Sequence, residues 1–110
     1  MISVCIATYN GEKYIKEQID SILCQLAEDD EIIVSDDNST DNTVQILKNY
    51  QDSRIHIYTN VEKKGYIHNF EHAIKQAKGD YIFLSDQDDV WISGKVKIIK
   101  NLLLQYEAVF

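Results

Sequence analysis

Hydrophobic positions along the chain alternate between two spacings. Short apolar runs rich in Ile, Val, Tyr or Phe predict β-strands over residues 2–7, 31–35, 54–59 and 80–85. The segments between them repeat apolar residues at i, i+3, i+4 and i+7, the spacing of one helix face. The four helical stripes are Ile15, Ile19, Ile22, Leu23 and Leu26; Val44, Leu47 and Tyr50; Ile67, Phe70, Ile74 and Ala77; and Val96, Ile99, Leu103 and Tyr106.

Residues that favour helix ends refine these limits. Ser39 or Thr40 is predicted to start the second helix and Ser93 to start the fourth, because their hydroxyls can cap free N–H groups. Gly79 is predicted to lie just past the end of the third helix.

The regular alternation of strands and helices predicts the fold class. Near-continuously apolar strands joined by helices imply a Rossmann-like three-layer α/β/α fold, with a mainly parallel sheet covered on both faces. A chain of 110 residues, 45% of them hydrophobic, is expected to form one unit over residues 1–110. Ligands of such folds bind beyond the carboxyl ends of the strands.

Charge, hydrophobic stretches and cysteine positions indicate which ligands and which cellular compartment suit the chain. A net charge of −7 argues against nucleic-acid binding, which depends on basic residues, and means that a phosphate-bearing ligand needs a cation. No apolar stretch has the length of a membrane span or a signal peptide, so the chain is expected to be cytoplasmic, or peripheral to the inner face of the membrane. Cys5 and Cys24 fall at apolar positions and are expected to be buried in a reducing compartment.

Polar loops follow three of the predicted strands, over residues 7–12, 36–41 and 86–89. Carboxyl ends of parallel strands share one edge, so these loops are expected to form a nucleotide-sized cleft. Tyr9 can stack on a base, and Asp37 can accept a hydrogen bond from a base N–H. Taken singly, each has a structural alternative: Tyr9 as loop packing, Asp37 as a partner of a helix dipole.

An acidic run closes the fourth strand. Asp86 and Asp88 supply hard oxygen ligands on a rigid support, which suits Mg²⁺ or Mn²⁺. The alternative is a polar turn that caps the next helix.

The order of these motifs resembles the amino-terminal, nucleotide-sugar-binding half of family 2 glycosyltransferases, which have the GT-A fold. The resemblance is carried by four sets of residues: Thr-Tyr-Asn at 8–10, Asp-Asp-Asn-Ser-Thr-Asp-Asn-Thr at 36–43, Asn60 with Lys64, Gly65 and Asn69, and Ser-Asp-Gln-Asp-Asp-Val-Trp at 85–91. The last run is similar to that of bacterial members that build capsular or O-antigen polysaccharides.

The resemblance implies a set of site residues. Those expected to border the donor nucleotide sugar are Ala7, Thr8, Tyr9, Asn10, Glu12, Asp37, Lys64, Gly65, Asn69 and Asp86. Within this set Asp37 is expected to contact the base. Asp86 and Asp88 are expected to hold Mn²⁺ or Mg²⁺ on the diphosphate.

The resemblance also implies an activity. It is metal-dependent, inverting transfer of a sugar from a UDP- or dTDP-sugar to a saccharide or lipid-linked acceptor. In the family the catalytic base comes from a segment that would follow Phe110, so we expect a truncated chain that binds the donor with little or no transfer. An exposed sheet edge and the apolar residues 107–110 favour self-association.

Two alternatives remain at this stage. One is a non-catalytic nucleotide-binding fragment. The other is a phosphatase similar to haloacid dehalogenases, with Asp86 as nucleophile and Asp88 as general acid. That family needs a Lys and further acids well downstream, for which the short remainder of the chain leaves no room.

Overall fold

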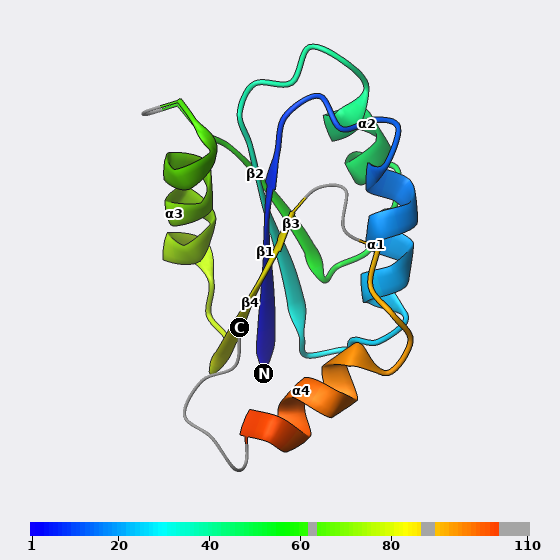
Figure 1. Cartoon of the computed structure of the whole chain (residues 1–110). Helices are drawn as coiled ribbons and strands as arrows, with labels where there is room; N and C mark the ends of the chain where they lie inside the picture. The colour runs from blue at the N-terminus through cyan, green and yellow to red at the C-terminus, as the bar shows by residue number, and fades with distance from the viewer. Residues whose placement is uncertain (62–63, 87–89, 104–110) are drawn as a thin grey trace.

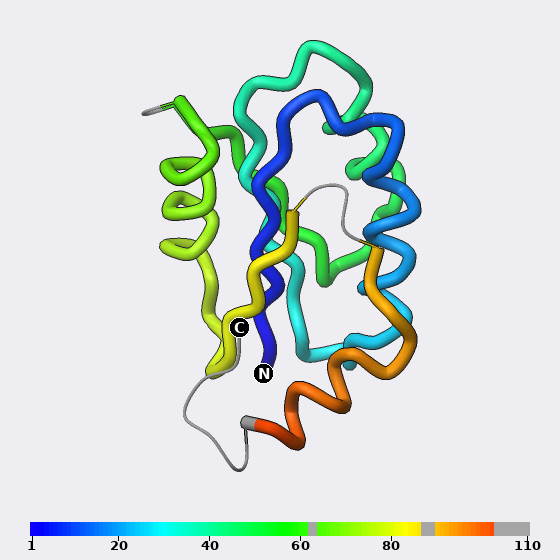
Figure 2. Tube along the Cα trace, in the orientation of Figure 1, coloured from blue at the N-terminus to red at the C-terminus, as the bar shows by residue number. Residues whose placement is uncertain are grey.

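The computed structural model describes residues 1–61, 64–86 and 90–103 (Figures 1 and 2). Strands and helices alternate along these residues. Their order is β1 (Ile2–Thr8), α1 (Ile15–Leu23), β2 (Glu31–Asp36), α2 (Thr43–Lys48), β3 (Ile55–Thr59), α3 (Tyr66–Gln76), β4 (Tyr81–Asp86) and α4 (Lys95–Leu103). The predicted alternation is confirmed for every strand and helix.

All strands of the sheet are parallel, in the order β3-β2-β1-β4. The chain moves outward from β1 through β2 to β3, then returns to the other side of β1 with β4, which Figure 2 shows beside it. Ala7 pairs with both Ser35 and Asp86, so the carboxyl ends of β1, β2 and β4 are level. A crevice for ligands is expected where the strand order reverses in this way.

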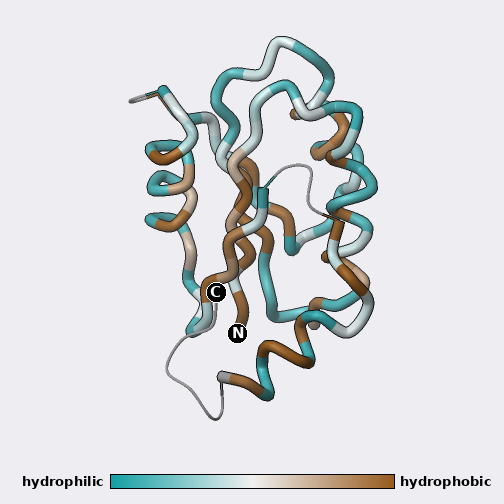
Figure 3. The backbone as a smooth tube through the Cα atoms, viewed as in Figure 1, coloured by the Kyte–Doolittle hydropathy of each residue, from teal (hydrophilic) through white to brown (hydrophobic). Residues whose placement is uncertain are grey.

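Helices cover both faces of the sheet, which confirms the three-layer α/β fold. Helices α1 and α2 lie on one face and α3 on the other (Figure 1). The larger core packs α1 against the sheet, and Trp91 and Val96 extend it toward α4. A smaller core under α3 contains Cys5, Ile33 and Ala73. Figure 3 shows apolar residues concentrated in the central strands and polar residues in the loops above their carboxyl ends.

The predicted start of the second helix is wrong. Helix α2 begins at Thr43 rather than near Ser39 or Thr40. The Ser39 backbone N–H and hydroxyl both donate to the Asp36 carboxylate, at 2.8 and 2.6 Å, and the Thr40 N–H donates to Asn10 Oδ1 at 2.8 Å. The Ser39 bonds close the loop after β2, and the Thr40 bond joins that loop to the loop after β1, so neither residue caps a helix.

Two further helix limits differ from prediction. Helix α4 begins at Lys95, after Gly94 in a left-handed conformation (φ 83°), and not at Ser93. Helix α3 ends at Gln76, so Gly79 is not its terminating residue. Gly79 instead lies against the start of β1.

The apolar stripe of α3 is rotated from its predicted position. Phe70 and Ala73 are buried with Asn69, whereas Ile67 is 69% exposed and Ile74 37% exposed. On the edge strand β4, Ile82 and Leu84 are also exposed. This uncovered apolar surface is compatible with self-association, which stays a prediction.

The two cysteines differ in burial. Cys5 is fully buried in β1, as predicted. Its burial and, to a smaller extent, the nearby Glu31 carboxylate raise the pKa of its thiol to about 12. Cys24 follows the last residue of α1 and is exposed, so its predicted burial is wrong. No helix in the described ranges has the length and hydrophobicity to cross a membrane.

Arg54, just before β3, connects the turn that contains Asp52 to the end of α1 and to the loop that follows α1. Its guanidinium donates to both oxygens of Asp52, at 2.8 and 3.0 Å, to the carbonyl of Leu23, the last residue of α1, at 3.2 Å, and to the carbonyl of Leu26 in the loop that follows, at 3.1 Å. The last carbonyls of a helix lack partners within the helix, so Arg54 provides a donor for the Leu23 carbonyl while Asp52 holds the guanidinium in place. The strand prediction therefore began one residue early, since β3 starts at Ile55.

The Asp52 pair gives the protein a pH-dependent contribution to stability. Hydrogen bonds from the Arg54 side chain and backbone hold the pKa of Asp52 below its ordinary value. A lowered folded-state pKa stabilises the fold above about pH 4, and this stabilisation is lost as the pH falls through the folded-state pKa. We expect Asp52→Asn to lower the free energy of unfolding, measured with urea, near neutral pH, with the difference from wild type shrinking in acid. A difference that stays constant with pH would contradict this assignment.

Candidate functional site

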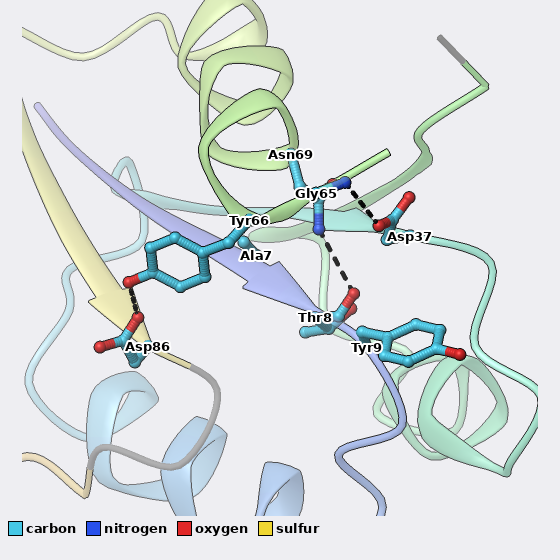
Figure 4. Close-up of a pocket in the computed structure, with 8 residues that line it drawn as sticks. All are labelled: Ala7, Thr8, Tyr9, Asp37, Gly65, Tyr66, Asn69 and Asp86. Carbon is cyan, nitrogen blue, oxygen red and sulfur yellow. Dashed lines mark hydrogen bonds between the residues drawn. The ribbon is translucent and has the colours of Figure 1, made fainter. Parts of the chain in front are cut away.

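A pocket of about 480 Å³ opens at the carboxyl ends of β1, β2 and β4. Its lining residues are Ala7, Thr8, Tyr9, Asp37, Gly65, Tyr66, Asn69 and Asp86 (Figure 4). All of these except Tyr66 were expected from the sequence. The pocket lies at the sheet edge where parallel α/β folds bind ligands.

Adjacent carboxylates after β2 have different positions. Asp36 is 1% exposed, and its carboxylate accepts hydrogen bonds from the hydroxyls of Thr8 and Ser39, both at 2.6 Å. It therefore holds the β1 and β2 ends together. Asp37 follows it and lines the pocket. The Asp37 backbone N–H donates to the Thr8 carbonyl at 2.9 Å, which holds Asp37 beside the end of β1.

Asp37 also connects the pocket to the start of α3. Its Oδ2 accepts a hydrogen bond from the Gly65 N–H at 3.2 Å. Gly65 adopts φ 114°, a conformation that favours glycine, and α3 begins at the next residue. The other oxygen, Asp37 Oδ1, is buried and has no hydrogen-bond partner among the described residues.

Asn69 presents a second acceptor in the pocket. Its side chain reaches from α3 to β1, where Nδ2 donates to the Thr8 carbonyl at 3.3 Å (Figure 4). Asn69 is 2% exposed, and its Oδ1 has no partner within the described part of the chain. A buried acceptor without a partner costs about 1–3 kcal/mol. Both acceptors therefore favour a ligand that brings hydrogen-bond donors.

Tyr66 and Asp86 close the opposite side of the pocket. Tyr66 is the first residue of α3, and its hydroxyl donates to Asp86 Oδ1. Its ring also makes an edge contact with Phe70, with ring centroids 4.9 Å apart. Sequence reasoning missed Tyr66. The available signal was its position directly after Gly65 and directly before Ile67, where the predicted apolar stripe of the third helix begins.

The other three predicted residues do not line the pocket. Asn10 Oδ1 accepts from the Thr40 N–H at 2.8 Å, and Glu12 Oε2 accepts from the Asn42 N–H at 3.1 Å. These two side chains brace the first loop against the second. Lys64 is exposed beside Gly65 and lies outside the lining.

The chemistry of the pocket suits a hard cation. Asp86 contributes a carboxylate, the ligand type that Mg²⁺ and Mn²⁺ prefer. Its predicted partner Asp88 lies outside the described residues. No group of three or more metal-binding side chains converges within the described ranges, so the metal pair remains an expectation. The two acids of the lining are not matched there by any basic side chain among the described residues.

Comparison with known proteins identifies relatives of the chain. The family described as glycosyl transferase family 2 matches residues 3–110. The Escherichia coli protein WfgD, a UDP-Glc:alpha-D-GlcNAc-diphosphoundecaprenol beta-1,3-glucosyltransferase, is 34% identical over the whole chain and 44% of its own length. The Shigella flexneri dTDP-rhamnosyl transferase RfbG is 46% identical over 84% of the chain and 34% of its own length.

Solved structures agree. S. aureus TarS 1-349 in complex with UDP-GlcNAc superposes with a TM-score of 0.86 and 29% identity, over 96% of this chain and 32% of that one. Glucosyl-3-phosphoglycerate synthase from Mycobacterium tuberculosis, solved with Mn²⁺ and UDP, superposes with a TM-score of 0.80 and 25% identity, over 97% and 40% of the two chains. The chain thus spans less than half the length of these relatives.

Proposed function

Because the chain belongs to glycosyltransferase family 2, we propose that residues 1–110 are the nucleotide-sugar-binding part of a sugar-transferring enzyme of bacterial polysaccharide biosynthesis. The donor is a UDP- or dTDP-sugar and the acceptor a saccharide or a lipid-linked saccharide. The name of WfgD includes UDP-Glc and a diphosphoundecaprenol acceptor, which supports a UDP-sugar donor and a lipid-linked acceptor. The name of RfbG, a dTDP-rhamnosyl transferase, supports a dTDP-sugar donor. A lipid-linked acceptor would place the enzyme at the cytoplasmic face of the membrane.

The two buried acceptors without partners carry the proposal. Uracil and thymine each have a ring N–H that can donate a hydrogen bond to Asp37 Oδ1. Tyr9, which also lines the pocket, offers an aromatic face on which the base can stack. Asn69 Oδ1 can accept from a further donor, such as a ribose hydroxyl.

A divalent cation belongs to the proposal because of charge. The chain carries a net charge of −7, and the described lining contains two acids, so an unaccompanied diphosphate would be repelled. Asp86, with Asp88, would hold Mn²⁺ or Mg²⁺. When bound, the cation neutralises the diphosphate that leaves the sugar. Asp86 is already aimed at the pocket by β4 and by the Tyr66 hydroxyl.

The transfer step requires a base that takes a proton from the acceptor hydroxyl. In an inverting displacement that base lies on the opposite side of the sugar from the leaving diphosphate. We place it after Phe110, in the portion of the relatives that this chain does not span. The isolated chain is then a donor-binding fragment without catalysis. The family match favours this assignment over the phosphatase alternative.

Calorimetric titration of UDP and dTDP, with and without Mn²⁺, tests the proposal. We expect binding that Mn²⁺ strengthens, and an Asp37→Ala variant that binds about 10–100-fold more weakly both with and without Mn²⁺. A hydrogen bond to a charged group contributes roughly 1.5–3 kcal/mol, and 1.4 kcal/mol is a factor of ten. The matched control is Asp29→Ala, an exposed acid at the other end of the sheet. If neither nucleotide binds the folded protein with Mn²⁺ present, the proposal is wrong.

A further inference from the structure

Helix α1 carries a buried polar side chain, Gln18, that contacts the end of β4 beside the pocket. Gln18 is 0% exposed, although its neighbours on the same face, Ile15, Ile19 and Ile22, form the apolar core. Its Nε2 donates to Ser85 Oγ at 2.8 Å and to the backbone carbonyl of Asp86. The end of β4 is therefore held by a side chain from a distant part of the sequence.

The end of β4 needs such support. Strand β4 is an edge strand, paired only with β1 within the described sheet, and the pairing stops where Ala7 meets Asp86. The Asp86 carbonyl lies at the limit of this ladder. By donating to it, Gln18 fixes the direction of the Asp86 carbonyl, while the Asp86 carboxylate turns toward the pocket and Tyr66.

The cost of burying Gln18 also points to a specific role. Its Oε1 is buried and has no partner among the described residues, which an apolar side chain would avoid. A buried polar group kept at a cost needs an explanation beyond packing. The explanation is that both N–H donors of its amide bind the last two residues of β4.

We propose that Gln18 is a positioning residue for Asp86, which sets the direction of its carboxylate for a cation in the pocket. The proposal rests on the proposed function, because it assumes that Asp86 contributes to cation-assisted nucleotide binding. Gln18 does not line the pocket, so it acts through the backbone of Asp86 and not on the ligand.

Gln25 provides a matched control. It lies seven residues after Gln18, two residues past the end of α1, and also holds a distant segment: Nε2 donates to the Ile92 carbonyl at 2.9 Å, and Oε1 accepts from the Val96 N–H at 3.0 Å. These bonds are of the same kind as those of Gln18, but none of them reaches Asp86. Replacing either glutamine by Met keeps the approximate side-chain size and removes its hydrogen bonds.

The experiment compares wild type, Gln18→Met and Gln25→Met by titration of UDP with and without Mn²⁺, together with thermal unfolding. We expect both variants to unfold at lower temperature. Only Gln18→Met should lose about tenfold or more of the strengthening by Mn²⁺, while its affinity for UDP without Mn²⁺ stays near the wild-type value. A purely structural role for Gln18 would not change one affinity without the other.

Each other outcome is decisive. Unchanged strengthening by Mn²⁺ in Gln18→Met overturns the positioning role and leaves the proposed function intact. Wild type without any strengthening by Mn²⁺ overturns the cation-assisted function instead. If Gln18→Met fails to fold, Gln18→Asn, whose shorter amide cannot reach both acceptors, takes its place. Failure of both to fold, while Gln25→Met folds, would make Gln18 a determinant of the fold and overturn the proposal.

Discussion

An Asp86→Asn variant is expected to lose nearly all the strengthening of UDP binding by Mn²⁺. Asparagine keeps the size of the side chain and can still accept the Tyr66 hydroxyl hydrogen bond, but it lacks the negative charge that a hard cation requires. We expect the affinity measured with Mn²⁺ to fall by roughly 100-fold, about 2.7 kcal/mol. Affinity without Mn²⁺ should stay the same or rise, because one charge that repels the diphosphate is removed.

Asp80→Asn is the matched control for this variant. Asp80 immediately precedes β4, so it lies at the amino end of the strand, where its exposed carboxylate pairs with the N-terminal amine at 3.2 Å. The substitution removes the same charge from the chain at the end of β4 remote from the pocket. Strengthening by Mn²⁺ that survives in Asp86→Asn would move the cation site away from β4.

A Gly79→Ala variant is expected to be strongly destabilised. A Cβ at this position would lie 2.7 Å from the Ser3 backbone nitrogen and 2.9 Å from the Ile2 carbonyl carbon. Both are backbone atoms of the central strand β1 and cannot move without disturbing the sheet. Overpacking of this kind costs about 3 kcal/mol. The loss should appear as a lower denaturant midpoint, with weaker UDP binding because β4 carries Asp86.

Lys78→Ala controls for a change at the neighbouring residue. The Lys78 side chain is exposed, and its backbone N–H, which donates to Glu31 at 2.8 Å, remains in the variant. A Ser3→Ala, Gly79→Ala double variant gives a second check. Because the close contacts include backbone atoms, removing the Ser3 hydroxyl should not restore stability. Full recovery would show that only the hydroxyl excludes a side chain here.

The sequence predicted the sheet well because its signals there are local. An apolar run that forms a buried parallel strand is visible in the residues themselves, as in residues 2–7 and 31–35. Helix starts were less predictable. Ser39 and Thr40 are good capping residues, but Asp36 and Asn10 take their hydrogen bonds. Asn10 lies thirty residues before Thr40, and a partner at that distance along the chain leaves no signal in a local pattern.

The site shows the same division. Asp37 and Asp86 could be predicted because they follow apolar strands whose carboxyl ends must meet. Tyr66 could not, because its role depends on where the first turn of α3 lies relative to β4. Asn69 was expected only from the family resemblance, since position 69 lies outside the predicted apolar stripe of this helix, yet the structure buries it. Its amide is accommodated there by the Thr8 carbonyl, a contact between distant parts of the chain.

The sheet order has a consequence for the time at which the pocket forms during synthesis. Strand β1 leaves the ribosome before the other strands of the sheet, yet its neighbour β4 begins only at Tyr81, which pairs with Ile2. Until then one edge of β1 has no partner and exposes unpaired backbone N–H and C=O groups. Closing so large a loop is slow compared with forming the helices between the strands. The pocket is therefore completed last, when β4 pairs with β1.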